Sequence, residues 1–178
     1  MLYPSVTEVL SPWADFSRIR PDVLEAAADR GTQVHDICAM IAQGLYFPES
    51  DIPENCAGYI KSFRRWIDFV VDDVILVEAR LVDDAFLYHG QIDLFVHEKH
   101  CEHILVDLKT PVALQRSWRL QLAGYKNLVE KNGYHPDRVG SLRLNPEGKT
   151  PTMKWYDGGT QDMNLFLQCL NLYRYFKS

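Results

Sequence analysis

The 178-residue sequence lacks the cysteine pairs and long apolar runs that mark several common protein classes. Its four cysteines, at positions 38, 56, 101 and 169, form no C-x-x-C pair, which argues against a zinc ribbon or an iron–sulfur cluster. We interpret them as scattered thiols of a reduced, cytoplasmic protein. Because no segment reaches ~18 apolar residues, the sequence predicts neither a signal peptide nor a membrane partner.

An excess of positive charge is also missing. Lysine and arginine total 19 against 24 acidic residues, which gives a formal net charge of -5. A domain that holds nucleic acid mainly through a basic face usually carries a positive excess, so the composition argues against a DNA-coating module. It does not argue against a nuclease, because a nuclease site needs carboxylates to bind cations.

The balance of 47% hydrophobic and 24% charged residues is that of a globular protein. We expect one domain over residues 1–178, with residues 1–20 as an N-terminal arm in which Ser5 caps a turn through Leu10. Gly31 either weakens the first long helix or marks a close packing contact.

The order of the predicted elements is typical of an α/β protein. From the spacing of apolar residues we predict helices at 21–44, 53–70, 115–130 and 161–176, and strands at 74–82, 86–96, 103–110, 139–145 and 152–156. Strands flanked in this way by helices predict a central mixed β-sheet that is covered on its faces.

Two neighbouring strands carry charged side chains in an unusual arrangement. Side chains alternate between the two faces of a strand. A hairpin centred on His100 would place Asp93 opposite Asp107 and Gln91 opposite Lys109. The other face would then be apolar, with Ile92, Leu94, Val96, Ile104, Val106 and Leu108. Like charges opposed across two strands are destabilising, and a divalent cation between the two carboxylates would remove the conflict.

Lys109 fits the same chemistry. A metal ion lowers the pKa of a bound water and polarises a phosphoryl oxygen, and a cation beside it can stabilise the charge that grows on phosphate. The alternative reading of a single D-x-K triplet is a solvent-facing hairpin with an ordinary salt bridge. The paired spacing and the matching apolar faces favour the metal site.

Four motifs follow one another along the chain. They are Arg-Gly-x-x-x-His at 30–35, Gly-x-x-Asp at 90–93, Asp-x-Lys at 107–109 and Gln-x-x-x-Tyr at 121–125. The middle two resemble the PD-(D/E)XK nuclease superfamily, and the outer two are similar to its RecB-like exonuclease branch. Ile92 stands where the name motif has proline. The resemblance implies an α/β, restriction-endonuclease-like core, and the missing cysteine set implies no iron–sulfur cluster.

The resemblance also implies a role for each matched residue. Asp93, Asp107 and His35 would bind the metal, helped by the backbone carbonyl of Leu108. Lys109 would act as the catalytic lysine together with the two acids. The alternative for His35 is a hydrogen-bonded histidine at the edge of the core. An imidazole ligand would favour Mn²⁺ somewhat relative to Mg²⁺.

Three further residues are expected beside the substrate. Gln121 and Tyr125 share a helix face, where they would contact substrate or orient the lysine, although ordinary packing is the alternative. Glu78 resembles the acidic position on the family's first strand and would support substrate binding. Arg116 and Arg119 could touch phosphate, but a solvated helix face explains them equally well.

These expectations converge on metal-dependent hydrolysis of DNA phosphodiester bonds, from an end, with one or two Mg²⁺ or Mn²⁺ ions. The main alternative is a catalytically silent module that binds DNA ends or proteins, and a weaker one is a metal hydrolase of small phosphoesters. By analogy with the family, recombination, repair or phage proteins are further candidate partners.

Overall fold

The computed structural model describes residues 3–14, 19–100, 102–110 and 114–177. Its five strands form one sheet in the order β1-β2-β3-β4-β5, in which only β3 and β4 run parallel. The elements are α1 (Val6–Leu10), η1 (Ser11–Trp13), α2 (Pro21–Ala42), η2 (Glu49–Asp51), α3 (Glu54–Val70), β1 (Val71–Asp83), β2 (Tyr88–Glu98), β3 (His103–Lys109), α4 (Ser117–Lys131), β4 (Arg138–Arg143), β5 (Thr152–Tyr156) and α5 (Thr160–Lys177). The predicted α/β class, a mixed sheet flanked by helices, is confirmed.

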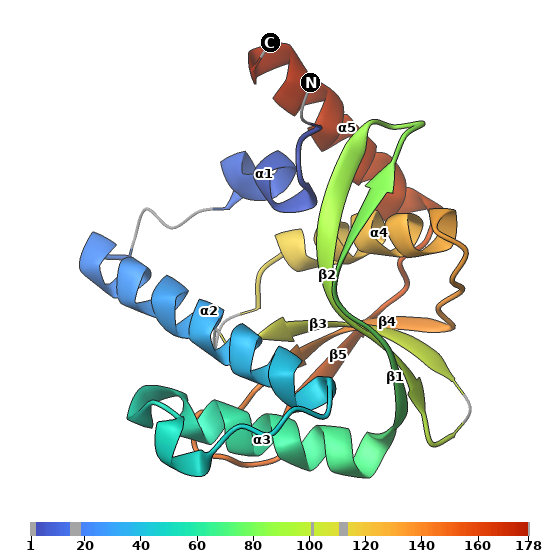
Figure 1. The fold of residues 1–178 in the computed structure, drawn as a ribbon. Helices are drawn as coiled ribbons and strands as arrows, with labels where there is room; N and C mark the ends of the chain where they lie inside the picture. The colour runs from blue at the N-terminus through green and yellow to red at the C-terminus, as the bar shows by residue number, and fades with distance from the viewer. Residues whose placement is uncertain (1–2, 15–18, 101, 111–113, 178) are drawn as a thin grey trace.

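Helices cover the sheet from both sides (Figure 1). One apolar core joins α2 and α3 to Leu94, Val96 and Val106 of the sheet. The second core joins α1, α4 and α5 to Phe95 and Leu105, which point the opposite way. The alternation of side chains along β2 and β3 therefore builds both cores, as period-two patterning predicts for a sheet covered on two faces.

The predicted hairpin register is confirmed where β2 and β3 pair. Leu94 lies opposite Val106 and His97 opposite His103, which centres the hairpin on His100. The ladder ends at Leu94, however, so it includes neither of the two expected pairs, Asp93 with Asp107 and Gln91 with Lys109. Past this point β2 follows β1 away from β3, as the twisted ribbon of Figure 1 shows.

One residue of the predicted apolar face is misplaced. Ile92 was expected beside Leu94, but it packs in the second core with α4 and α5. The β1–β2 register is the same at the Val77–Leu94 and Ala79–Ile92 pairs, but Glu78 between them has a φ of 47°. A left-handed residue breaks the regular alternation of side chains in the ribbon, so the neighbouring residues turn to the other side of the sheet.

The part of the N-terminal arm that the structure describes is docked rather than free. Ser5 caps α1 in a reciprocal capping box with Glu8, as the predicted cap at Ser5 requires. Val6, Val9 and Leu10 are buried in the second core. The rest of the arm, residues 1–2 and 15–18, lies outside the described residues, as does Cys101.

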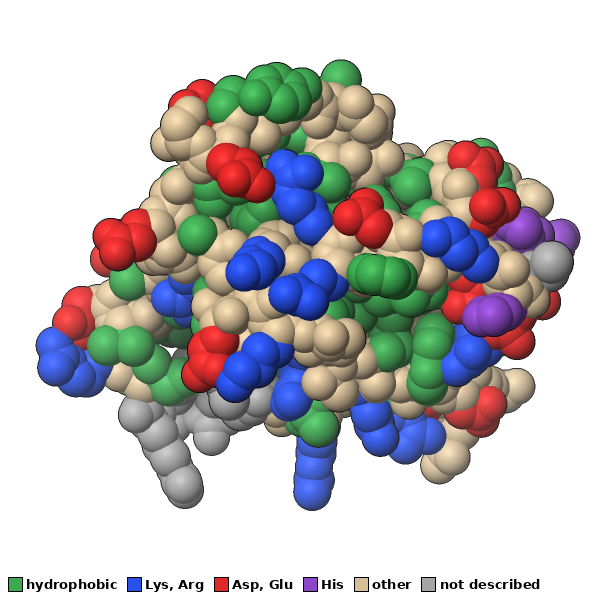
Figure 2. All heavy atoms as spheres, turned by 90° about the horizontal axis from the view of Figure 1, so that it is seen from below, with side chains coloured by type: hydrophobic (Ala, Val, Ile, Leu, Met, Phe, Trp, Pro, Cys, Tyr) green, Lys and Arg blue, Asp and Glu red, His purple; other side chains and the backbone are tan. Residues whose placement is uncertain are grey.

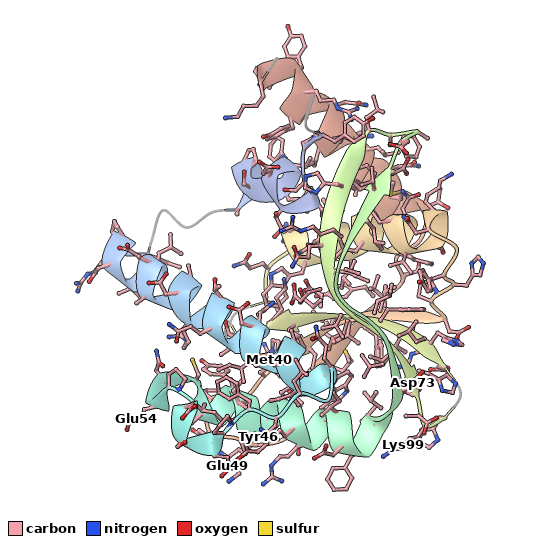
Figure 3. All side chains as sticks on the ribbon, in the orientation of Figure 1. Met40, Tyr46, Glu49, Glu54, Asp73 and Lys99 are labelled. Atoms are coloured by element: carbon pink, nitrogen blue, oxygen red, sulfur yellow. The ribbon has the colours of Figure 1, made fainter. Side chains whose placement is uncertain are left out.

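The described cysteines are free thiols: Cys38 and Cys56 are buried and Cys169 is half-buried. Across the described residues, the structure contains no helix that is both long and apolar enough to span a membrane. The β2–β3 turn is tied to the end of α3 by Lys99, labelled in Figure 3, whose Nζ donates to the carbonyl oxygen of Asp68 at 2.6 Å.

Alanine substitutions at two helical glycines are expected to have opposite effects on the stability of the protein. A Cβ on Gly58 of α3 would lie 1.6 Å from the carbonyl oxygen of Pro146, whereas a Cβ on Gly31 of α2 would meet only Thr110 Oγ1, at 3.7 Å. We expect Gly58→Ala to lower the free energy of unfolding by at least ~2 kcal/mol, because backbone must shift to admit the methyl group. Gly31→Ala should raise it by about 1 kcal/mol through helix propensity. Urea denaturation measures both, and equal stability of the two variants would contradict this reading.

Candidate metal and catalytic site

The site forms where β2 separates from β3. The backbone N–H of Leu108 donates to Asp93 Oδ2 at 2.6 Å, in place of a ladder bond. Both residues are buried, so this N–H would otherwise lack a partner. Asp93 is therefore fixed in the gap between the strands, with its second carboxylate oxygen turned toward α2.

Helix α2 supplies the next group. Val34, Ile37 and Cys38 pack α2 onto the sheet, and this places His35 above the gap. Its Nδ1 lies 3.5 Å from Asp93 Oδ1. Burial by itself lowers the pKa of His35, but the negative charge of Asp93 outweighs it and raises the pKa to about 9. The same charge pair lowers the pKa of Asp93 against the opposing effect of burial.

Glu78 completes this group from β1. One potential ligand atom from each of His35, Glu78 and Asp93 lies within 4.8 Å of the others. The left-handed backbone at Glu78 turns its side chain out of the ladder, and Gln91 Nε2 donates to Glu78 Oε2 at 2.5 Å. Gln91 is held in turn by Arg80, whose Nε donates to Gln91 Oε1 at 3.1 Å. Burial and the charge of Asp93 raise the pKa of Glu78.

Asp107 and Lys109 stand next to this group as an ion pair. Asp107 Oδ2 lies 2.7 Å from Lys109 Nζ, and the Asp107 side chain is only 3% exposed. Burial raises the pKa of Asp107 to about 6, against the opposing charge of Lys109. Apart from Lys109, this Oδ2 has no hydrogen-bond partner among the described residues. A carboxylate oxygen has two lone pairs, so one remains for a ligand.

Helix α4 holds the lysine from the other side. Lys109 Nζ donates to Gln121 Oε1 at 3.0 Å, and Gln121 Nε2 donates to the hydroxyl of Tyr125 at 3.2 Å. The Trp118 ring lies against the ammonium group, 5.4 Å from its centroid to Nζ. Burial raises the pKa of Tyr125, which therefore stays protonated and available to this chain of hydrogen bonds. The ammonium position is thus fixed by an acid, an amide and a ring.

The donor set fits a divalent cation. It offers one imidazole and two carboxylates close together, with the carboxylate of Asp107 beside them. Carboxylate oxygens with an imidazole suit Mg²⁺ or Mn²⁺, and without a cation two acids this close repel each other. The structure brings together the eight site residues that the resemblance implies: His35, Glu78, Asp93, Asp107, Leu108, Lys109, Gln121 and Tyr125. Arg116 and Arg119, the two further candidates for phosphate contact, line a different pocket.

The site opens into a pocket of about 430 Å³ beside α1. Glu78, Asp93 and Tyr125 line it from the site, and Arg80 and His89 line it further out. Sequence reasoning missed Arg80, because no motif marks it and its position follows from the β1–β2 pairing. Gln91 stood inside the Gly-x-x-Asp motif, but its bond to Glu78 depends on the irregular backbone at that residue.

The His35–Asp93 pair predicts how the stability of the metal-free protein varies with pH. The pKa of His35 is raised from 6.5 to about 9 on folding, so its contribution is fully present below pH 6.5 and is lost as the pH rises through 9. We expect a loss of roughly 1–3 kcal/mol across this window in the presence of a chelator. The measurement is urea denaturation at pH 6.5 and pH 9. His35→Gln should lose clearly less stability over the same interval, and an unchanged pH dependence in that variant would refute the assignment.

Comparisons with known proteins give little beyond these observations. No protein-family model matches the chain, and no curated protein matches its sequence. One solved structure that resembles it is described as "Crystal Structure of LHK-Exo in complex with dAMP". The two chains are 14% identical, the alignment covers 98% of this chain and 91% of that one, and the TM-score is 0.42. A likeness at this level does not assign an activity.

Proposed function

We propose that the chain is a divalent-metal-dependent deoxyribonuclease of the PD-(D/E)XK type, in its RecB-like branch, that hydrolyses phosphodiester bonds from a strand end. The observation that carries this proposal is the cluster of His35, Glu78 and Asp93 ligand atoms beside the buried Asp107–Lys109 pair. A structural role alone would not explain three carboxylates and a lysine in one partly buried place.

In this proposal His35, Glu78 and Asp93 hold the ion, and Asp107 with the carbonyl of Leu108 completes the shell. The bound Mg²⁺ or Mn²⁺ would lower the pKa of a water and polarise a phosphoryl oxygen. His35 must give up its proton before its nitrogen can bind metal, so metal binding and proton release are linked.

Lys109 has the second role. Its ammonium group is fixed by Gln121 and lies against Asp107, so it needs no reorganisation to face negative charge that develops on a phosphate. The pair also keeps Asp107 ionised against the cost of burial, which a metal ligand requires. Gln121 and Tyr125 act through the lysine as positioning residues, and Arg80 lies where a neighbouring phosphate would enter the pocket.

End-labelled single- and double-stranded DNA, incubated with Mg²⁺, Mn²⁺ or a chelator, tests the activity. We expect products only with a metal ion, and a covalently closed circle should resist cleavage if the enzyme needs an end. A Lys109→Met protein purified in parallel controls for contaminating nuclease. Metal-dependent DNA binding without any product would instead support the silent binding module, which the net charge of -5 leaves as the second candidate.

A further inference from the structure

A second open pocket, of about 480 Å³, lies at the start of α4, apart from the metal-binding group. Three elements line it: α4 with the residues just before it, strand β5, and the start of α5. Arg116 and Arg119 enter it from the α4 end and Lys154 from β5. Three cations therefore border one pocket in a chain whose net charge is negative.

Two of these cations have no partner among the described residues. Arg116 and Lys154 are exposed and make no hydrogen bond or ion pair there. Arg119 differs, because its Nε lies 2.6 Å from Asp162 Oδ1, and Asp162 is only 2% exposed in its side chain. The buried acid anchors Arg119 at the pocket wall. Asp157 also acts on the charge of Arg119, so three cations stand against two acids and the balance stays positive.

The helix end itself adds to this charge. Helix α4 begins without a side-chain cap and without an acidic residue in its first turn, and Arg116 stands at the cap position. Free N–H groups give a helix N-terminus a partial positive charge, so basic residues there are unfavourable in the absence of an anion. An anionic ligand would turn this unfavourable arrangement into a binding site.

The pocket also offers apolar surface next to its cations. Tyr156 of β5 is half-buried, and Leu120 and Leu165 line the pocket beside it. Nucleic-acid strands alternate a charged phosphate with a flat base, and proteins bind single strands by combining cations with aromatic stacking. A free inorganic anion would not use the apolar part.

We propose that this pocket binds the substrate strand outside the metal site, with a phosphate between Arg116 and Lys154 and a base against Tyr156. The orientation of this strand toward the metal site rests on the proposed function. Gln121, which holds Lys109, follows Arg116 by five residues, about 7.5 Å along the helix axis. The two residues are also about 140° apart around the helix, so Arg116 and Gln121 project from different sides of α4.

The test measures binding of a fluorescent single-stranded oligonucleotide to the full chain in chelator, by anisotropy, over a range of salt concentrations. The double variant Arg116→Gln, Lys154→Gln should raise Kd about tenfold at low salt. It should also reduce the slope of log K against log salt by about 0.7, since the one phosphate contact that is lost contributes about that amount on a single strand. Thermal melts should match those of the unaltered protein.

A matched control removes the same charge elsewhere. Lys61 and Arg65 are exposed on α3. Helix α3 lies at the lower side of Figure 1, and Figure 2 shows that this side carries both basic and acidic side chains. Lys61→Gln, Arg65→Gln should change Kd less than about threefold and leave most of the salt slope. Equal effects of the two double variants, or no binding by the unaltered protein, would overturn the proposal.

The binding test and the cleavage test can fail separately. If the oligonucleotide binds through the pocket but is never cleaved with any metal, the proposed nuclease function fails and the pocket assignment stands. If cleavage occurs and the pocket variant keeps the KM of the unaltered protein, only the pocket assignment fails. In the active protein we expect KM to rise about tenfold while kcat changes less than threefold, because the pocket lies away from the reacting phosphate.

Discussion

Replacing Lys109 with methionine is expected to lower the rate of DNA cleavage by at least about 10²–10³-fold. The substitution keeps much of the apolar stem but removes the ammonium group that Asp107, Gln121 and the Trp118 ring hold in place. Metal affinity should change much less than the rate, since His35, Glu78 and Asp93 are untouched. Single-turnover cleavage and calorimetric titration with Mn²⁺ measure the two quantities.

Lys126→Met provides a matched control. Lys126 lies on α4, and its only ion pair or hydrogen bond among the described residues is a 3.9 Å ion pair with Glu130, one helical turn further on. Its loss removes one positive charge without touching the site, so the cleavage rate should stay within about twofold. Full activity of Lys109→Met, in a preparation whose chelated sample is inactive, would rule out the catalytic role of this lysine.

Substitution of Asp93 is expected to have the second large effect. It should reduce both DNA cleavage and folding stability, and two variants separate these two losses. Asp93→Ala removes a metal ligand and also leaves the buried N–H of Leu108 without an acceptor. Asp93→Asn removes the negative charge but keeps a carbonyl oxygen for that N–H. Both should reduce cleavage at least about 10²-fold through loss of metal. Only the alanine variant should also lose about 1–3 kcal/mol of folding free energy.

Calorimetry with Mn²⁺ and urea denaturation distinguish these two losses. Metal binding by Asp93→Asn with unaltered affinity would remove Asp93 from the ligand set, whatever its stability. Equal stability of the two variants would show that the bond to Leu108 contributes little. In the metal-free protein the asparagine variant should also flatten the pH dependence assigned to His35, because the charge that raises the histidine pKa is gone.

Much of this site follows from local pattern. The polar connector after Val96 and the alternation in both strands were enough to centre the hairpin on His100. The ladder stops at Leu94, one residue short of the expected Asp93–Asp107 pair. The spacing of Gln121 and Tyr125 on one helix face likewise anticipated their contact. The side-chain periodicities of strands and helices depend only on residues that are close in the sequence, so they can be recognised in a single sequence.

Other features depend on contacts between distant segments. The position of Glu78 beside His35 and Asp93 requires a left-handed backbone, which is uncommon for a residue other than glycine, and nothing in the local sequence marks it. The shift of Ile92 to the second core follows from that same irregularity. The meeting of Lys154 with Arg116 needs the β4–β5 pairing and the packing of α5 on α4. Such tertiary arrangements override what propensity alone predicts.

Asp93 contacts both Leu108 and His35, and this bears on how a protein with the proposed activity could lose that activity in the course of evolution. One carboxylate oxygen of Asp93 accepts a hydrogen bond from β3, and the other faces His35. If selection for the proposed activity were lost, we would expect His35 or Glu78 to be substituted first, because neither residue holds the two strands together. Under the proposed function, asparagine at position 93 would abolish metal binding but keep an acceptor for the Leu108 N–H, so an inactive descendant is expected to carry asparagine there.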